Sequence, residues 1–224
     1  MVDFALDVRN ATLLNSNNKV IFDSLTFSVP SSTSSIIYSK RTRSLSSLLN
    51  CIYGSKDLSS GLIKVSANIS WPIAAIPSLP LSLSPKELSR FLLGVYDFQG
   101  DHSCSIEIVQ NYSRLSSTEW QEPTKLLPSF LQKNFLLAMS LVIPFDLYLV
   151  DPYLLNYIFK DSFLREHWSP ILDEFFSVNF FLALSCNFWD LSCFCNNYIV
   201  IDPVSIPDNI TPNDIIAETT DTLD

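Results

Sequence analysis

Glycine is scarce in this chain: 4 of its 224 residues are glycine, against roughly 7% in an average protein. Loops that wrap phosphate groups use glycine because converging backbone N–H groups need positive φ angles that other residues resist. The shortage therefore counts against an intact glycine-rich nucleotide loop. General drift in composition is an alternative explanation of the same number.

Charge is also scarce, and positive charge most of all. Charged residues make up 17% of the chain, the net charge is −9 and the isoelectric point is about 4.6. Because binding nucleic acid requires a basic face, this balance excludes a nucleic-acid partner, and it argues against direct adhesion to anionic lipid. With 47% hydrophobic residues, the sequence predicts a large core or a sizeable surface that faces a partner.

Several other features are missing. The five cysteines, at positions 51, 104, 186, 193 and 195, are irregularly spaced and there are only 2 histidines, so we expect reduced thiols and no metal site. The first ten residues lack the basic and apolar regions of a signal peptide. The longest apolar stretch, 135–151, is interrupted by Pro144 and Asp146. It predicts a buried helix and a buried strand and no direct membrane insertion.

The remaining pattern alternates strands and helices, which predicts an α/β layered domain with a mixed sheet. Ser84 and Glu87 form a capping box around Pro85 and mark a helix start. Residues 110–127 lack periodicity and predict a loop, and the acidic segment 203–224 predicts a loosely ordered tail. The expected strands cover 4–9, 20–29, 36–38, two short segments within 62–71, 146–151, 179–185 and 197–201, and the expected helices cover 45–53, 85–97, 129–142 and about 156–176.

Two segments have the order of a nucleotide-binding domain. Residues 34–54, SSIIYSKRTRSLSSLLNCIYG, read as strand, turn and helix, and residues 145–152, FDLYLVDP, read as a buried strand that ends in aspartate. This is the layout of a P-loop NTPase. The turn contains no glycine, however, and Leu45 stands where the phosphate-binding lysine belongs.

Four further segments support a family resemblance over about residues 5–202. They are IFDSLTFSVPSS (21–32), ISWPIAAIPSLPLSLSPKELSRF (69–91), FLLAMSLVIPFDLYLVD (135–151) and FFLALSCNFWDLSCFCNNYIVID (180–202). In this order they resemble ABC-type ATPases, and most closely the ATPase subunits of capsular polysaccharide exporters. The resemblance implies one P-loop NTPase-like domain over 1–202, with helices flanking the sheet, a small antiparallel edge and a helical insertion at about 82–142.

The resemblance also assigns functional positions, and most of them hold residues that cannot do the family's chemistry. Only the magnesium-side hydroxyl, Ser46 or Ser47, and the aspartate after the second strand, Asp151, are retained. The replaced positions are the adenine-stacking aromatic near Asn15, the loop glycines at Ser39, Thr42 and Ser44, the lysine at Leu45, the glutamine near Pro80, the signature pair at Ser129 and Phe130, the general base at Pro152 and the switch histidine at Cys186.

These losses predict a protein that does not hydrolyse ATP. Leucine cannot neutralise phosphate charge as the lysine does, and Pro152 cannot act as a base. The resemblance then implies an inactive ATPase homologue with a structural, docking or regulatory role in surface polysaccharide export or assembly. Such a subunit needs no cofactor. We expect it in the cytoplasm, peripheral to the inner membrane through a membrane export subunit or a glycan-assembly protein, and dimerisation is possible.

An active ATPase subunit of a polysaccharide exporter is the alternative. Lys40, Arg41 and Arg43 form the only basic cluster, which is either a solvated surface turn or an anion site built from side-chain charge. In the second case ATP and magnesium would bind there together with Ser46 and Asp151. This alternative lacks a candidate base near Asp151. A third possibility is an unrelated α/β binding module.

The expected helix 85–97 is the candidate partner surface. Phe91, Leu92, Tyr96 and the following Phe98 offer more apolar area than a free surface usually shows, and in ABC ATPases the helical insertion contacts the transport subunit. The alternative is that these side chains pack only within the domain.

Overall fold

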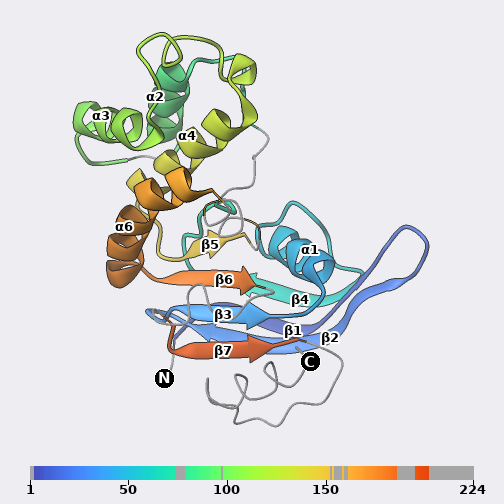
Figure 1. Ribbon diagram of the computed structural model, residues 1–224. Coiled ribbons are helices and arrows are strands. Elements are labelled where there is room, and N and C mark those ends of the chain that lie inside the picture. Colours follow the sequence, from blue (N-terminus) through green and yellow to red (C-terminus); the bar gives the residue numbers. More distant parts are fainter. Residues whose placement is uncertain are drawn as a thin grey trace, which may run out of the picture.

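A computed structural model of the chain describes residues 3–73, 79–96, 98–151, 153, 158, 161–185 and 195–201. The described elements form two sheets and a set of helices (Figure 1). The strands are β1 (Phe4–Leu14), β2 (Val20–Pro30), β3 (Ser35–Tyr38), β4 (Ser60–Val65), β5 (Tyr148–Val150), β6 (Phe181–Ser185) and β7 (Asn197–Val200). The helices are α1 (Thr42–Ile52), α2 (Pro85–Val95), α3 (His102–Ser113), α4 (Ser129–Val142), α6 (Ser162–Val178) and the 3₁₀ turn η1 (Thr124–Leu126).

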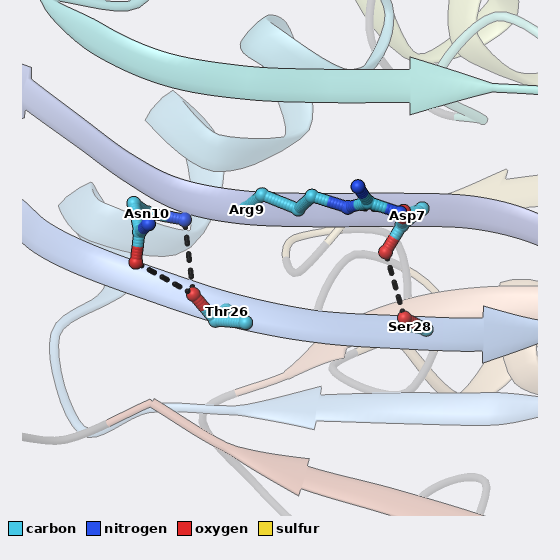
Figure 2. A network of polar contacts seen from close by, with 5 residues as sticks. All are labelled: Asp7, Arg9, Asn10, Thr26 and Ser28. Carbon is cyan, nitrogen blue, oxygen red and sulfur yellow. Dashed lines mark hydrogen bonds and ion pairs between the residues drawn. The ribbon is translucent and has the colours of Figure 1, made fainter.

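The first sheet is antiparallel, with strand order β2-β1-β4. Buried Leu6 and Val8 on β1 alternate with polar residues, as expected for a sheet with one dry face. Figure 2 shows two polar contact groups that join β1 to β2. The Ser28 hydroxyl donates to Asp7 at 2.8 Å, and the Asn10 amide donates to the Thr26 hydroxyl at 2.9 Å. These bonds join the two strands of the long β1–β2 hairpin, in addition to the backbone bonds of the sheet.

The second sheet is parallel, with strand order β5-β6-β3-β7. Its strands carry apolar residues on both faces because both faces are covered. Ile37 and Leu182 pack with α1 and the antiparallel sheet in one core. Ile36 and Phe181 pack with the helices α2, α4 and α6 in another. In Figure 1, α2 and α3 lie at the top, away from the sheets, and α4 leads down from them toward the parallel sheet.

The predicted fold class is confirmed: the molecule is α/β, with strands of both directions and flanking helices. The capping box at Ser84 is present, with Pro85 at the first helical position. Most predicted strands and helices lie within a few residues of the observed ones. The predicted tail 203–224 lies outside the described residues.

Three predictions about elements are wrong. Residues 62–71 hold the end of one strand, β4, followed by an isolated bridge at Ile69. The predicted loop 110–127 begins inside a helix, α3, whose N-terminus is capped by the Asp101 carboxylate. The first helix begins at Thr42, three residues before the predicted start, because the turn after β3 continues directly into helical conformation.

None of the helices in the described part of the chain combines the length and the apolar character that a membrane span requires.

Candidate functional site

The carboxyl ends of the parallel strands bring part of the predicted nucleotide-site positions to one end of the sheet. In Figure 1 the arrowheads of β3, β6 and β7 point to the right, and α1 follows β3 at that end. Ser39 follows β3 and Asp151 follows β5, with β6 between these two strands. The Ser39 amide donates to the Ser185 carbonyl at the end of β6, at 3.3 Å. This edge is where open α/β sheets place their ligand sites.

The turn between β3 and α1 is short and closed by its own hydrogen bonds. Only Ser39, Lys40 and Arg41 separate the two elements. The Arg41 amide donates to the Ser39 hydroxyl at 3.0 Å, and the Ser44 amide donates to the Arg41 carbonyl at 2.9 Å. No residue from 39 to 47 has a positive φ. The backbone therefore does not form the concave arrangement of N–H groups that holds phosphate.

Serine hydroxyls stabilise this arrangement, a role that the sequence analysis missed. Ser39 is buried and accepts the amide bond described above. The Ser44 hydroxyl donates to the Ile21 carbonyl on β2 at 2.9 Å. The signal was the residue type itself, because serine readily bonds to nearby backbone groups. The serines at two expected glycine positions therefore tie the turn and the first turn of α1 in place.

Leu45 is fully buried, with 0% of its side chain exposed. It packs in the core shared by α1 and the sheets, together with Leu48 and Leu49 on the same helix. These three residues form a core-facing stripe on α1. A side chain at position 45 points into the apolar interior and cannot contact a phosphate from there.

The retained polar positions are Ser46 or Ser47 on α1, which follows β3, and Asp151, which follows β5. The Ser46 hydroxyl oxygen is buried and has no hydrogen-bond partner among the described residues, while Ser47 is partly buried. Asp151 is partly buried and accepts a hydrogen bond from the Tyr153 amide at 2.8 Å. Burial raises the pKa of the Asp151 carboxyl, and the Tyr153 bond and the Lys133 charge oppose that shift only in part.

Most of the other assigned positions are exposed or fall outside the described residues. Lys40, Arg41 and Arg43 are exposed, which both the surface-turn and the anion-site interpretations allow. Ser129 opens α4 and is exposed together with Phe130. Pro152 and Cys186 lie outside the described residues.

Two more expected positions serve local structure. At the tip of the β1–β2 hairpin, the Asn15 side-chain oxygen accepts bonds from the Asn17 and Lys19 amides, each at 2.9 Å. The Pro80 carbonyl accepts a bond from the Leu83 amide at 3.0 Å. Both residues therefore stabilise turns.

The candidate partner surface on α2 is smaller than predicted. Leu92 is only 2% exposed and belongs to the core, so its prediction as a contact residue is wrong. Tyr96 and Phe98 are partly buried and pack against the same core. Phe91 is 45% exposed, and Val95, one turn later on α2, is exposed as well. The large apolar side chains on the outward face of α2 are this pair.

The geometry does not fit the phosphate chain of a nucleotide as it stands. A phosphate needs converging N–H groups and a cation, whereas this turn has no positive-φ residue and its expected lysine position is a buried leucine. Asp151 and Ser46 have the chemistry of magnesium-side groups, but the described residues contain no cluster of three or more acidic, histidine or cysteine side chains that could hold a metal.

Known proteins support the family resemblance. The chain is 26% identical over 180 residues to the polysialic acid transport ATP-binding protein KpsT of Escherichia coli, covering 80% of this chain and 79% of that protein. It is 25% identical over 188 residues to the ATP-binding protein BexA of Haemophilus influenzae, covering 84% of each. It is 30% identical over 106 residues to the capsule polysaccharide export ATP-binding protein CtrD of Neisseria meningitidis serogroup B, covering 47% of this chain and 48% of that protein. No family model matches the chain.

Solved structures agree on the fold. An ATP-binding subunit of an ABC transporter aligns with a TM-score of 0.71 at 13% identity, covering 96% of this chain and 93% of that one. The cbiO1 protein of Clostridium perfringens, part of the ABC transporter complex cbiONQ, aligns with a TM-score of 0.60 at 15% identity, covering 97% and 92%. The fold is that of the ATP-binding subunits of ABC transporters, and the chain is similar to ATP-binding proteins of polysialic acid transport and of capsule polysaccharide export.

Proposed function

We propose that this chain is an ABC-ATPase homologue without hydrolytic activity that serves as a docking or regulatory subunit in the export or assembly of a surface polysaccharide. The observation that supports it is the closed turn before α1. Leu45 is buried where a phosphate-binding lysine is expected, and residues 42–44 are helical where a loop is expected. Because leucine cannot donate to or neutralise a phosphate, the strongest nucleotide contacts of such sites are missing.

The polysaccharide pathway comes from the relatives. Two of them are named for polysialic acid transport and capsule polysaccharide export, and one of these alignments covers about four fifths of each chain. We therefore place this subunit at the cytoplasmic side of a membrane export machine, held there by a protein partner.

The partner contact that we propose is the outward face of α2. Phe91 and Val95 are exposed one helical turn apart, which gives the i and i+4 spacing of a helix that packs into a groove. The buried Leu92, which points about 100° away from Phe91, fixes the helix on its own domain.

The proposed role does not rest on a shared active site with an intact ATPase. Phe130, at the assigned signature position, is half exposed beside the exposed Ser129. A bulky ring there would separate a partner's bound nucleotide from the α4 N-terminus. Both halves of a composite site would then be lost on this subunit, so pairing with an intact ATPase would impair both sites of the pair.

Titration calorimetry with Mg-ATP tests the proposal. The purified chain should give no saturable heat below about 1 mM, whereas an intact relative such as KpsT, measured in the same buffer, supplies the positive control. Saturable micromolar binding would overturn the inactive assignment.

An active ATPase is the second candidate, favoured by one observation. The buried Ser46 hydroxyl has no hydrogen-bond partner among the described residues, and Asp151 keeps its carboxylate at the same end of the sheet. If this candidate is correct, the chain releases phosphate from ATP and Asp151→Asn abolishes the release. Phosphate release that is equal in the wild type and in this variant would come from a contaminating enzyme.

A further inference from the structure

A cavity lies at the end of the parallel sheet opposite to the nucleotide-site positions. Its volume is about 470 Å³, and five separate segments line it. They are the start of β1, the β2–β3 turn, the residues after β4, the residues before β5 and the junction of α6 with β6. The strands β5 and β6 of the parallel sheet reach the cavity with their amino ends, so a ligand bound here would not compete with one at their carboxyl ends.

Backbone hydrogen bonds make the cavity wall rigid. The Ser31 amide donates to the Asp3 carbonyl at 2.8 Å, and the Ser66 amide donates to the Ala5 carbonyl at 2.9 Å. The Asn68 amide donates to one carboxylate oxygen of Asp146 at 2.8 Å. A ligand would therefore meet a preformed site and would not have to order it.

The charges of the lining residues all have one sign. Asp3 and Asp146 are both exposed and both line the cavity, and the lining contains no lysine, arginine or histidine. Within the described residues, neither carboxylate has a cationic partner. The Asn68 amide occupies only one oxygen of Asp146. Two uncompensated carboxylates on a preformed wall are complementary to a cationic group.

Exposed apolar side chains also line the cavity. Phe4 and Phe180 both line the cavity and are exposed, and Val178 is 73% exposed at the end of α6. A bare metal ion would leave these side chains without a role, and the described residues hold no cluster of three ligands for one. A basic side chain next to an apolar one uses both features.

We propose that this cavity is the docking site for an extended protein segment in which an arginine lies beside an apolar residue. The guanidinium group pairs with Asp3 and Asp146, because its planar fork suits carboxylates, and the apolar neighbour packs against Phe4 and Phe180. The segment comes from a partner. The chain's own residues 203–224 include five acidic and no basic residues, so like charge disfavours them as the occupant. This proposal does not depend on whether the chain hydrolyses ATP.

Fluorescence anisotropy with labelled peptides tests the proposal on the full chain. The probe is a fluorescein-labelled heptapeptide with a central Leu-Arg-Phe flanked by glycine and serine, and the matched peptides replace Arg with Glu or replace both apolar residues with Ser. The Arg peptide should bind saturably below about 1 mM. The Glu peptide should bind at least about tenfold more weakly, and added salt should lower the affinity for the Arg peptide.

The variants locate the binding. Asp3→Asn combined with Asp146→Asn should weaken the Arg peptide by about tenfold, and asparagine at 146 keeps an acceptor for the Asn68 amide. Asp57→Asn removes one exposed carboxylate from the loop before β4, outside the cavity, and should leave the affinity unchanged. Phe180→Ser should lower the affinity for the Arg peptide and leave the affinity for the Ser-substituted peptide unchanged.

Three results would overturn the proposal: no saturable binding of the Arg peptide, equal affinity for the Glu peptide, or an affinity that the double variant leaves unchanged. Circular dichroism melting of each variant identifies any loss of affinity that comes from unfolding. If the double variant is less stable, Phe180→Ser alone decides the test.

Discussion

Replacing Leu45 with lysine restores the residue type that nucleotide binding would require, but at a position that is fully buried. Leu45 packs among Leu48 and Leu49 of α1 and the apolar face of the parallel sheet. A lysine there has two options. It can bury an unpaired ammonium group in this core, or it can turn α1 to reach solvent and leave a cavity behind.

The free-energy cost of each option can be estimated. Emptying a buried leucine site costs about 2–5 kcal/mol, and an uncompensated buried charge costs about 3–5 kcal/mol. We therefore expect Leu45→Lys to lower the free energy of unfolding by about 3–5 kcal/mol. For a chain of this size that corresponds to a fall in melting temperature of about 6–20 °C. Leu45→Met keeps the volume and should cost less than about 1.5 kcal/mol.

Urea unfolding followed by circular dichroism measures these differences, and Mg-ATP calorimetry on the same samples measures binding. Leu45→Lys should be strongly destabilised and should still not bind Mg-ATP. A lysine variant that keeps its stability within about 1 kcal/mol of the wild type and gains saturable nucleotide binding would refute the reasoning. It would mean that position 45 faces an open phosphate site.

Three further predictions concern other parts of the molecule. Asp151→Asn should raise stability at pH 7, because burial raises the pKa of this carboxyl. The wild type loses no stability to this carboxyl below its unfolded-state pKa of about 3.9, and it loses stability as the pH rises through the raised folded-state pKa. The stability that Asp151→Asn gains over the wild type should therefore vanish in urea unfolding near pH 3. Ser84→Ala breaks the capping box and should cost about 1 kcal/mol in the same assay; an unchanged midpoint would contradict the cap's role. Charge at Phe91 and Val95 should abolish co-purification with an export partner and shift melting by only a few degrees, whereas Leu92→Asp should unfold the domain.

The sequence predicts elements well where local chemistry and periodicity agree. The cap at Ser84 and the stripe of Leu45, Leu48 and Leu49 both specify their helices without help from distant residues. The helix α3 was missed because its buried face consists of Ser105, Val109 and Ser113. Two small polar residues give no apolar stripe, and the Asp101 cap was the only local sign of the helix.

The candidate partner surface shows a second limit of sequence reasoning. Phe91 and Leu92 are neighbours in the chain and similar in hydrophobicity, yet one is exposed and the other buried. Successive residues on a helix point about 100° apart, so both cannot face the same partner. Leu92 faces a core cluster that also contains Trp71 and Phe145, which are distant from it in the sequence.

The replaced lysine and the replaced glycines belong to one structural change. Leu45 is seated in the core only if α1 is helical around it, and the helix in turn extends back to Thr42. The Ser44 hydroxyl then reaches the Ile21 carbonyl and anchors this first turn to β2. Glycine at position 44 would remove that bond and lower helix propensity, while Leu45 would still hold the helix in place. A phosphate site could therefore return only if both positions changed together, which is why a single reverted residue should destabilise the domain without restoring nucleotide binding.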